Sequence, residues 1–485
     1  MQLAPGSVAV RTAARVDHCR AIPLERQRVV LEIAPAGRRK PAHSADDVLA
    51  LCRDEDVQFV NLQFTDVMGI PKLVTIPVDV FPEVIEHGQW FDGSSIAGFA
   101  RIAESDMFLM PDLATFNIIP WERGRNTTAQ VVCWVYKPNG ELFMGDPRAV
   151  LLQQLERLAK LGFAFYTGPE LEFFLFRKDG DEISVLPHDR GGYFDLSTDL
   201  AAEVRKDMIR ALQQMGIKVE AGHHEVAIGQ HEIDFEYADA MTTADQATTF
   251  KFTLKAIAQQ HGLHATFMPK PVEGIAGSGM HTHQSLAWLA DGSNAFVDED
   301  DAYGLSTIAK HFLAGQLHHI RGMTAILNPL VNSYRRLVPG YEAPVYISWA
   351  RQNRSALIRV PAIRAGRTNA TRIELRCPDP TSNPYLAYAV MVAAGMDGIN
   401  RELPLPEPIE ENVYHFSEED LQRRNIGTLP STLGEAIDEL QRDDVIRDAL
   451  GEHVFERLIE AQKQEWKAFC RHVSAWERER YLEVY

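Results

Sequence analysis

The sequence has 485 residues, of which 45% are apolar and 24% charged, and this size and composition indicate two or three globular domains. Its net charge of −18 argues against sequence-independent binding to nucleic acids, and no window approaches the roughly 18 uninterrupted apolar residues of a membrane span. Five widely spread cysteines without a CxxC pair favour free thiols in the reducing cytoplasm over disulfides or a zinc ribbon.

Residues 1–43 differ in composition from the rest of the chain. They carry seven arginines and one lysine against three acidic residues, and their apolar residues show no clear periodicity. An arginine-rich leader is typical of a transit peptide, but Asp17, Glu25 and Glu32 weaken that interpretation. We therefore expect a disordered or wrongly extended start.

A small mixed α/β domain is predicted over residues 44–140. Ser44, followed by two acidic residues, is typical of a helix N-cap. The alternating pattern over 57–64 predicts a half-buried strand, and a turn leads to a returning strand at 73–76. Further strands are predicted around 116–119 and 130–135.

A larger α/β domain is predicted over residues 146–485. Asp146 followed by Pro147 begins a predicted helix that runs through Leu161. The strands beyond this helix carry unusual numbers of charged residues. The end of the domain has helical patterns at 432–440 and 454–471.

Glu170 and Glu172 stand two residues apart in an aromatic and aliphatic segment that is typical of a strand. Both side chains therefore project from the same face. Two carboxylates about 7 Å apart repel each other away from water unless a cation lies nearby. A solvated strand face is the alternative, but the apolar run that follows favours metal ligation.

Further candidate ligands lie in two other segments. Glu225 and Glu232 belong to a segment of mixed character, and His281 and His283 alternate after a glycine-rich turn. Each histidine by itself is more often a core or surface residue than a ligand. An oxygen-rich site with one imidazole suits Mg²⁺ or Mn²⁺ better than zinc.

Charged residues alternate again near the end of the larger domain. Arg372, Glu374 and Arg376 share one strand face, a pattern that equally fits exposed cross-strand ion pairs. Further arginines cluster upstream, at positions 335, 336, 351, 354 and 359. In so acidic a chain this clustering indicates an anionic ligand. Acids that hold cations beside arginines that hold anions suit phosphoryl transfer, although neither a P-loop nor a Rossmann motif is present.

Five long motifs make the chain resemble bacterial type I glutamine synthetase along nearly all of residues 44–485. They are Phe91-Asp-Gly-Ser-Ser-Ile, Gly168-Pro-Glu-Leu-Glu-Phe-Phe, Phe267-Met-Pro-Lys-Pro leading to Gly277-Ser-Gly-Met-His, Asn332-Ser-Tyr-Arg-Arg-Leu-Val-Pro-Gly-Tyr-Glu-Ala-Pro, and Arg372-Ile-Glu-Leu-Arg-Cys-Pro-Asp-Pro. The resemblance implies an α+β fold with an N-terminal β-grasp domain and a larger catalytic α/β domain. It also implies a dodecamer of two stacked hexameric rings, with each active site between neighbouring subunits.

The resemblance also implies roles for individual residues. At least two divalent cations, Mg²⁺ or Mn²⁺, would be bound, one by Glu172, Glu225 and Glu232 and another by Glu170, His281 and Glu374. ATP would lie near Tyr237, His283, Ser285 and Arg372, and glutamate would be bound by Arg336, Arg376 and the backbone of Gly277. Arg354 and Arg359 would hold the transferring phosphate, while Asp66 of the adjacent subunit would join Tyr193, Glu225 and Glu342 around the ammonium ion.

The implied activity is ATP-dependent synthesis of L-glutamine from L-glutamate and ammonia through γ-glutamyl phosphate. Asp66 would be the base that takes a proton from ammonium, and Glu342 would close the site against water. The alternatives are a ligase that joins glutamate to a polyamine or another amine, and a catalytically silent oligomeric scaffold. Ala276, where relatives commonly have asparagine, favours the amine alternative, whereas Asp66, Tyr193 and Glu342 favour ammonia.

Regulation is less directly indicated. Tyr414 lies near a position that is adenylylated in one branch of the family, but its neighbours do not match that branch. We therefore expect Tyr414 to be an ordinary packing residue. The chain is more similar to the branch controlled by glutamine feedback, in which Arg101 would matter.

Overall fold

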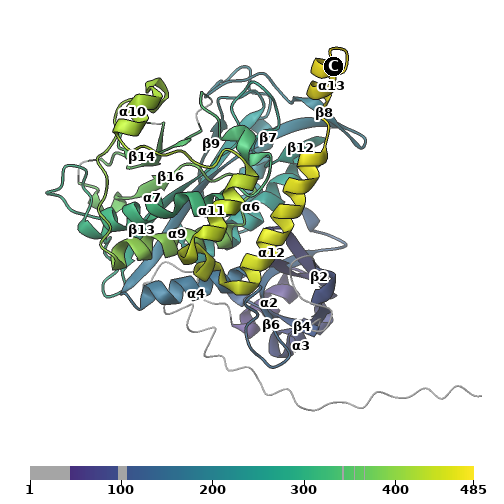
Figure 1. Cartoon of the computed structure of the whole chain (residues 1–485). Coiled ribbons are helices and arrows are strands. Elements are labelled where there is room, and N and C mark those ends of the chain that lie inside the picture. Colours follow the sequence, from purple (N-terminus) through teal and green to yellow (C-terminus); the bar gives the residue numbers. More distant parts are fainter. Residues whose placement is uncertain (1–43, 97–105, 341–342, 354, 365) are drawn as a thin grey trace, which may run out of the picture.

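The computed structural model describes residues 44–96, 106–340, 343–353, 355–364 and 366–485 (Figure 1). They form a small N-terminal unit and a larger unit, each built on its own sheet. The long helix α12 (Asp444–Arg471) runs down the outside of the larger unit, and α13 (Ala475–Tyr481) projects from the body at the end of the chain (Figure 1).

The N-terminal unit contains a six-stranded sheet in the order β2-β1-β6-β4-β3, with β5 also paired to β6. β1 (Phe59–Thr65) runs antiparallel to β2 (Pro71–Pro77) and parallel to β6 (Thr128–Tyr136). β6 is buried along its whole length, which suits a central strand covered on both faces. The remaining elements are α2 (Ala45–Asp54), α3 (Phe81–His87), β3 (Gln89–Asp92), β4 (Asp106–Pro111) and β5 (Asn117–Ile118).

Local signals in the sequence explain where this unit begins. The Ser44 hydroxyl accepts the backbone N–H of Asp47, and the Asp47 carboxylate accepts the backbone N–H of Ser44. This capping box confirms the predicted helix start. The strands predicted at 57–64 and 73–76 are also confirmed, as β1 and β2. The strand predicted at 116–119 is only two residues long, because Asp112 caps a 3₁₀ turn directly before it.

The larger unit is built on a ten-stranded sheet in the order β14-β15-β16-β13-β7-β10-β9. β7 (Phe163–Asp179) is 17 residues long and also pairs with β8, β11 and β12. Its aromatic and aliphatic run suits a strand buried on both faces. The other strands are β8 (Glu182–Pro187), β9 (Val219–His224), β10 (Gln230–Phe235), β11 (Ala238–Asp239), β12 (Leu263–Thr266), β13 (Met280–Trp288), β14 (Tyr346–Ala350), β15 (Ala356–Arg359) and β16 (Ile373–Leu375).

Helices pack in front of this sheet in the view of Figure 1. The predicted helix at 146–161 is confirmed and is capped by Asp146, and the pattern at 454–471 forms the second part of α12. α12 begins earlier than predicted because Asp443 caps it, and it bends at Gly451, where φ is +73°. The helices are α4 (Pro147–Ala159), α5 (Ala202–Gln214), α6 (Ala240–Gln260), α7 (Thr307–Leu327), α8 (Ser333–Arg336), α9 (Pro384–Asn400), α10 (Glu418–Arg423) and α11 (Leu433–Arg442).

A buried arginine joins the two units. Arg148 is 2% exposed, and its guanidinium donates to both carboxylate oxygens of Asp245, at 3.0 and 2.8 Å, and to Asp112 at 2.7 Å. The Tyr385 hydroxyl also donates to Asp245, and the guanidinium stacks 3.8 Å from the ring centroid of Trp134. Every charge in this junction cluster therefore has an oppositely charged partner.

The structure also bears on the smaller expectations for the cysteines and for Tyr414. The four cysteines among the described residues are free thiols, as predicted. Tyr414 is a packing residue, as predicted, because its hydroxyl donates to the carbonyl of Ala343 at 2.7 Å and its ring packs near Tyr346. The predicted disordered start lies outside the described residues. Over the described ranges, no helix combines the length and apolar character that a bilayer crossing requires.

Candidate active site

The register of five neighbouring strands brings many of the predicted site residues into one row. β10, β7, β13, β16 and β15 lie side by side and each contributes a charged residue. Directly opposed residues of antiparallel strands have Cα atoms about 5 Å apart, so their side chains can interact. The opposed pairs are Glu232 with Glu172, Glu170 with His281, His283 with Glu374, and Glu374 with Arg359.

Glu170 lies between the two histidines of β13. Its Oε1 is 2.8 Å from Nε2 of His283, and its Oε2 is 3.6 Å from Nδ1 of His281. The same Nδ1 is 3.8 Å from Oε1 of Glu374. Burial acts to raise the pKa of Glu170, but hydrogen bonds and charge from both histidines lower this pKa well below its usual range. The two histidines therefore favour the ionised form of Glu170.

The two histidines are not equally available to a cation. Arg372 donates from Nε to Nδ1 of His283 at 3.2 Å. Because an arginine can only donate, Nδ1 must accept, and Nε2 of His283 then carries the hydrogen that it donates to Glu170. Both ring nitrogens of His283 are thus occupied. His281 is the better-placed imidazole for a cation between Glu170 and Glu374.

A second group of acids surrounds His223. Its Nε2 is 3.4 Å from Oε2 of Glu232, and its Nδ1 is 4.0 Å from Oε1 of Glu225. Burial, followed by the charge of Glu225, raises the pKa of Glu172. Burial, followed by the charge of Glu172, raises the pKa of Glu232. Unlike the charges of the junction cluster, these buried carboxylates repel one another.

The donor set fits divalent cations. Carboxylate oxygens with a single imidazole are the ligands that Mg²⁺ and Mn²⁺ prefer. A cation would also relieve the repulsion that raises the pKa values of Glu172 and Glu232. Two groups of possible ligand atoms each lie within 4.8 Å of one another, namely Glu170 with His283 and Glu374, and His223 with Glu225 and Glu232. In the first group both ring nitrogens of His283 are already hydrogen-bonded, so His281 is the imidazole that could take its place.

A third group of possible ligands, Asp189, His224 and His231, does not have the chemistry of a metal site. Arg205 donates to Nδ1 of His231 at 3.1 Å, so Nε2 carries the hydrogen and has no lone pair for a metal. His224 and Asp189 are hydrogen-bonded to each other at 2.9 Å. This group is a buried polar network that includes His224 of β9 and His231 of β10.

Arginines surround the other end of the row. Arg359 donates to Glu374, and Nε of Arg376 is 3.2 Å from Oε1 of the same glutamate. Arg336 is buried and donates to the carbonyls of Cys377 and Arg376. Nη1 of Arg376 is buried and has no hydrogen-bond partner among the described residues. An unsatisfied buried guanidinium N–H is well suited to a carboxylate ligand.

Gly277 lies against Arg336 in the turn before β13. A Cβ atom at Gly277 would lie 2.2 Å from the carbonyl oxygen of Pro269, so only glycine fits this close approach. The same Cβ would lie 3.3 Å from Cγ of Arg336. The structure therefore brings the predicted glutamate-binding residues Gly277 and Arg336 together.

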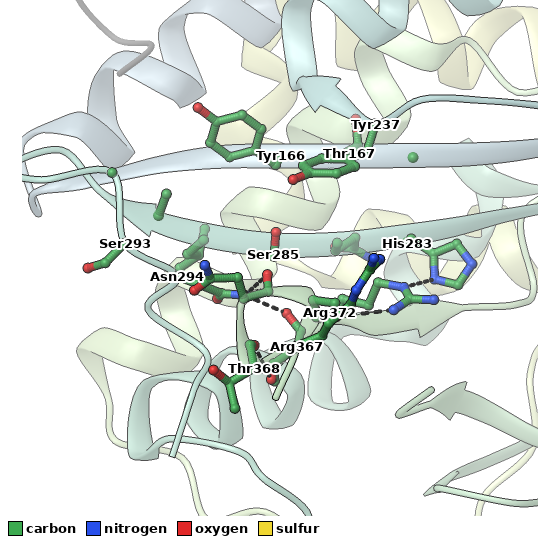
Figure 2. Close-up of a pocket in the computed structure, with 18 of the residues that line it drawn as sticks. Tyr166, Thr167, Tyr237, His283, Ser285, Ser293, Asn294, Arg367, Thr368 and Arg372 are labelled. Atoms are coloured by element: carbon green, nitrogen blue, oxygen red, sulfur yellow. Dashed lines mark hydrogen bonds between the residues drawn. The ribbon is translucent and has the colours of Figure 1, made fainter. Parts of the chain in front are cut away.

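A cavity of about 1020 Å³ lies beside the row and reaches Glu170 (Figure 2). Its volume is in the range of small-molecule and cofactor sites. All four predicted nucleotide-binding residues line it, namely Tyr237, His283, Ser285 and Arg372. It is also lined by residues that the sequence analysis did not single out, including Tyr166, Ser293, Asn294, Arg367 and Thr368.

Other predicted site residues are not placed in the row. Asp66 is buried in the β1–β2 turn, where it accepts the N–H of Ile70 and lies 3.2 Å from Nζ of Lys72. Tyr193 is 45% exposed, and its ring centroid is 5.5 Å from that of His223. Glu342, Arg354 and Arg101 lie outside the described residues.

Two residues beside the metal-ligand candidates were missed as site residues by the sequence analysis. His223 stands two positions before Glu225, and Gln230 stands two positions before Glu232. Because side chains alternate along a strand, this spacing of two is the signal that could have identified both residues. Asn294 and Thr368 have no such signal, since they come from loops that only the tertiary fold brings together.

Comparison with known proteins gives consistent results along most of the chain. Residues 56–138 match the family model described as "Glutamine synthetase, beta-Grasp domain", and residues 144–481 match "Glutamine synthetase, catalytic domain". A protein named "Glutamine synthetase" from Thermus thermophilus is 52% identical over 445 residues, which is 90% of this chain and 99% of the relative. One from Methanosarcina mazei is 49% identical over 448 residues, or 92% of this chain and 99% of the relative. The solved structure titled "GmaS/ADP complex-Conformation 1" superposes with a TM-score of 0.82 at 32% identity, covering 90% of this chain and 100% of that one.

Proposed function

The chain belongs to the glutamine synthetase family and is a ligase that forms L-glutamine from L-glutamate and ammonia, and we propose that ATP drives this reaction through γ-glutamyl phosphate. One observation carries the proposal. A cavity of nucleotide size ends at Glu170, where buried carboxylates lie next to Arg376 with its unsatisfied N–H. Acids for cations and arginines for anions are what transfer of a phosphoryl group to a carboxylate requires.

The proposed metal ligands are those that the family resemblance implies. Glu172, Glu225 and Glu232 would hold one divalent cation, and Glu170, His281 and Glu374 another. The availability of His281, in contrast to the occupied nitrogens of His283, supports this division. When bound, Mg²⁺ or Mn²⁺ would offset charge on the phosphate oxygens.

The proposed nucleotide site is the cavity lined by Tyr237, Ser285 and Arg372 (Figure 2). Asn294 donates to the carbonyls of Asn369 and Thr371, which fixes the loop that forms one wall. The cavity opens onto Glu170, so a triphosphate that enters it would extend towards the proposed metal ligands.

Glutamate would be bound at the arginine end of the row. Arg376 offers a free N–H, and Arg336 lies beside the backbone of Gly277. The γ-carboxylate oxygen would attack the γ-phosphorus of ATP, and ADP would leave with the electrons of the broken bond. Arg359, together with Arg354, would hold the transferring phosphoryl group by charge and orientation.

The second half of the reaction needs a site for ammonium. We assign Tyr193, Glu225 and Glu342 to this site, with Asp66 supplied by a neighbouring subunit. Asp66 would take one proton from ammonium, and ammonia would then attack the acyl carbon. Phosphate would leave with the electrons of the broken C–O bond, and the second proton that the nitrogen loses would pass to this phosphate. The carboxylate of Asp66 contacts Ile70 and Lys72 in its own chain, and no contact with Tyr193 or Glu225 is seen among the described residues, as a role in trans requires.

Sharing of the site requires a ring-forming oligomer, and we propose a dodecamer of two hexameric rings. A β-grasp domain over residues 44–140, a catalytic domain over 146–485 and a cytoplasmic location belong to the same proposal.

Mixed oligomers test the shared site. Subunits with Asp66→Asn and subunits with Glu374→Gln should each be inactive alone and regain activity when they are unfolded and reassembled together. Mixtures that stay inactive, although mixed rings form, would contradict a shared site.

Ala276 is the position that bears on the alternative, an amine as acceptor. It is half-buried in an apolar cluster with Phe174 and Ile275, and its methyl group cannot replace the hydrogen bond of an asparagine. We expect this to weaken glutamate binding by about 1–2 kcal/mol. It leaves the proposed metal ligands untouched, so we keep ammonia as the substrate.

The direct test is phosphate release from ATP in the presence of Mg²⁺ and glutamate. Ammonium should drive turnover with glutamine as product, whereas methylamine, ethanolamine, putrescine and spermidine should not. Glu232→Gln should abolish turnover, and the matched control Glu236→Gln on the same hairpin, where the exposed glutamate pairs with Lys218, should not. Turnover with an amine alone would assign the enzyme to the γ-glutamyl-amide ligases.

A further inference from the structure

Gln230 is a fully buried polar residue at the start of β10, directly beside the acids of the proposed metal site. Its side chain is 1% exposed. It stands two residues before Glu232 on the same strand, and β10 pairs with β7, the strand that carries Glu172. None of the roles described above uses this side chain.

The amide of Gln230 makes three hydrogen bonds, each to a different part of the site. Nε2 donates to Oε2 of Glu172 at 2.8 Å and to the carbonyl oxygen of Gly277 at 3.1 Å. Oε1 accepts the backbone N–H of Ala227 at 3.2 Å. Two partners are pure acceptors and the third is a pure donor, so only this orientation of the amide satisfies all three.

These bonds lock one oxygen of Glu172. Oε2 also accepts the backbone N–H of Gly279 at 2.9 Å, so two donors hold the same oxygen. The carboxylate cannot rotate without breaking both bonds. Neither bond involves the other oxygen, Oε1, and Glu172 itself is directly opposed to Glu232 in the β7–β10 pair.

The same amide ties two loops to that carboxylate. Ala227 belongs to the loop between Glu225 and Glu232, and this loop is closed by backbone hydrogen bonds from Glu225 to Gln230 and from Gln230 to Ala227. Gly277 belongs to the turn that lies against Arg336. The side chain of Gln230 therefore connects the loop between Glu225 and Glu232, the carboxylate of Glu172 and the turn at Gly277.

We propose that Gln230 is a positioning residue that orients Glu172 towards the bound cation and couples this orientation to the glutamate-binding turn at Gly277. The inference rests on the metal site of the proposed function. Residues that hydrogen-bond to a metal ligand typically change metal affinity 10–100-fold when they are replaced.

The chemistry of the position selects an amide. A methionine has similar length but cannot donate, so Oε2 of Glu172 would lose one of its two donors. An asparagine keeps the amide but is one methylene shorter, so it cannot span Glu172, Gly277 and Ala227 together. Both variants are therefore expected to loosen the site while they leave the β7–β10 pairing in place.

The molecule offers a matched control in Gln154. It is also fully buried and its Nε2 donates to a backbone carbonyl, that of Ala449, at 3.0 Å. It lies in α4 against α12, away from the strands that carry the metal-ligand candidates. Loss of a buried amide hydrogen bond is thus common to both positions, and only Gln230 touches the site.

The experiment measures binding of Mn²⁺ to the metal-free oligomer by following the free ion with electron paramagnetic resonance. Gln230→Met should weaken at least one class of Mn²⁺ site 10–100-fold and raise the KM for glutamate, whereas Gln154→Met should change neither. Circular dichroism and oligomer size verify folding. If Gln230→Met does not fold, Gln230→Asn is compared with Gln154→Asn in the same way.

The outcomes separate this inference from the function on which it rests. Wild-type enzyme that binds no Mn²⁺ would overturn the proposed metal site, and the role of Gln230 with it. Wild-type binding together with unchanged affinity in a folded Gln230 variant would overturn only the role of Gln230. An equal loss of affinity in the Gln154 variant would likewise overturn it, because the effect would then follow from burial alone.

Discussion

The junction cluster around Arg148 and the acidic row around Glu232 are both buried, but their charges balance differently. At the junction, Arg148 pairs with Asp112 and Asp245, and Tyr385 supplies a further hydrogen bond. In the row, Glu172 and Glu232 face other carboxylates, and burial with mutual repulsion raises the pKa of both. The first cluster pairs its charges within the chain, although Nη1 of Arg148 has no hydrogen-bond partner among the described residues, whereas in the second like charges face one another and a cation would balance them.

The difference shows how a structural cluster can be told from a functional one. Both contain residues that are rarely buried, so burial alone does not separate them. What separates them is whether each buried charge faces an opposite charge or a like charge. An unbalanced buried cluster is costly to the fold, and its persistence indicates a ligand that is absent from the chain itself.

The largest effect is expected at the junction. Arg148→Met leaves Asp112 and Asp245 without their cation, and removal of one member of a buried ion pair costs about 3–5 kcal/mol. We expect a marked fall in the midpoint of thermal unfolding, measured at fixed protein concentration. Arg157 lies on the same helix as Arg148 and pairs at the surface with Asp448 of α12, so Arg157→Met should have little effect. A small change in the unfolding midpoint of Arg148→Met would contradict the conclusion that the junction depends on this buried ion pair.

The next largest effect is stabilisation by the cation. Mn²⁺ at 100 times its dissociation constant should stabilise the folded protein by about 2.7 kcal/mol, because it binds the folded state alone. Differential scanning calorimetry with and without Mn²⁺ measures the effect. Glu232→Gln should reduce it, and Glu236→Gln should preserve it. Equal stabilisation of the wild type and Glu232→Gln would mean that the ion binds elsewhere.

A smaller effect of opposite sign is expected when an acid is removed from the metal-free row. Glu232→Gln replaces a buried carboxyl, whose ionised form is disfavoured by burial and by the charge of Glu172, with an uncharged amide and should therefore stabilise the metal-free protein by about 1 kcal/mol. Urea unfolding after chelation measures the change. Glu232→Gln would thus abolish activity and raise the free energy of unfolding of the metal-free protein. A lower free energy of unfolding would show that the charges of the row are already balanced without a cation.

The smallest effect concerns His319, which bridges Asp397 and Asp443 at 2.9 and 2.8 Å. Burial acts to lower its pKa, but the hydrogen bonds to Asp443 and Asp397 raise the pKa above the usual value, while His318 and Arg401 also face this bridge. Since the folded-state pKa is raised, the contribution is complete below about pH 6.5 and is lost as pH rises through the folded value. We expect stability to fall by up to about 1 kcal/mol over that window. His319→Gln should flatten this part of a pH–urea profile, and an unchanged profile would contradict the bridge.

Much of the local structure was predictable because short-range chemistry determines it. Ser44 with Asp47 sets a helix start, the apolar run of β7 sets a long strand, and Glu170 with Glu172 share a strand face by alternation alone. The acids and arginines also indicate phosphoryl transfer by their residue types and spacing. Cap chemistry and strand alternation act over two to four residues, so they can be read directly from the chain.

Other features depend on contacts between distant residues. The register sets Glu232 of β10 opposite Glu172 of β7. Arg372 occupies a nitrogen of His283 on the neighbouring strand, and this contact makes His281 the available imidazole. The amide of Gln230 likewise reaches from β10 to Glu172 of β7. The sequence by itself determined the residue types, their faces and the family to which they point. The tertiary structure decided which charges are balanced and which nitrogen is free, because these depend on distances between strands that no local pattern contains.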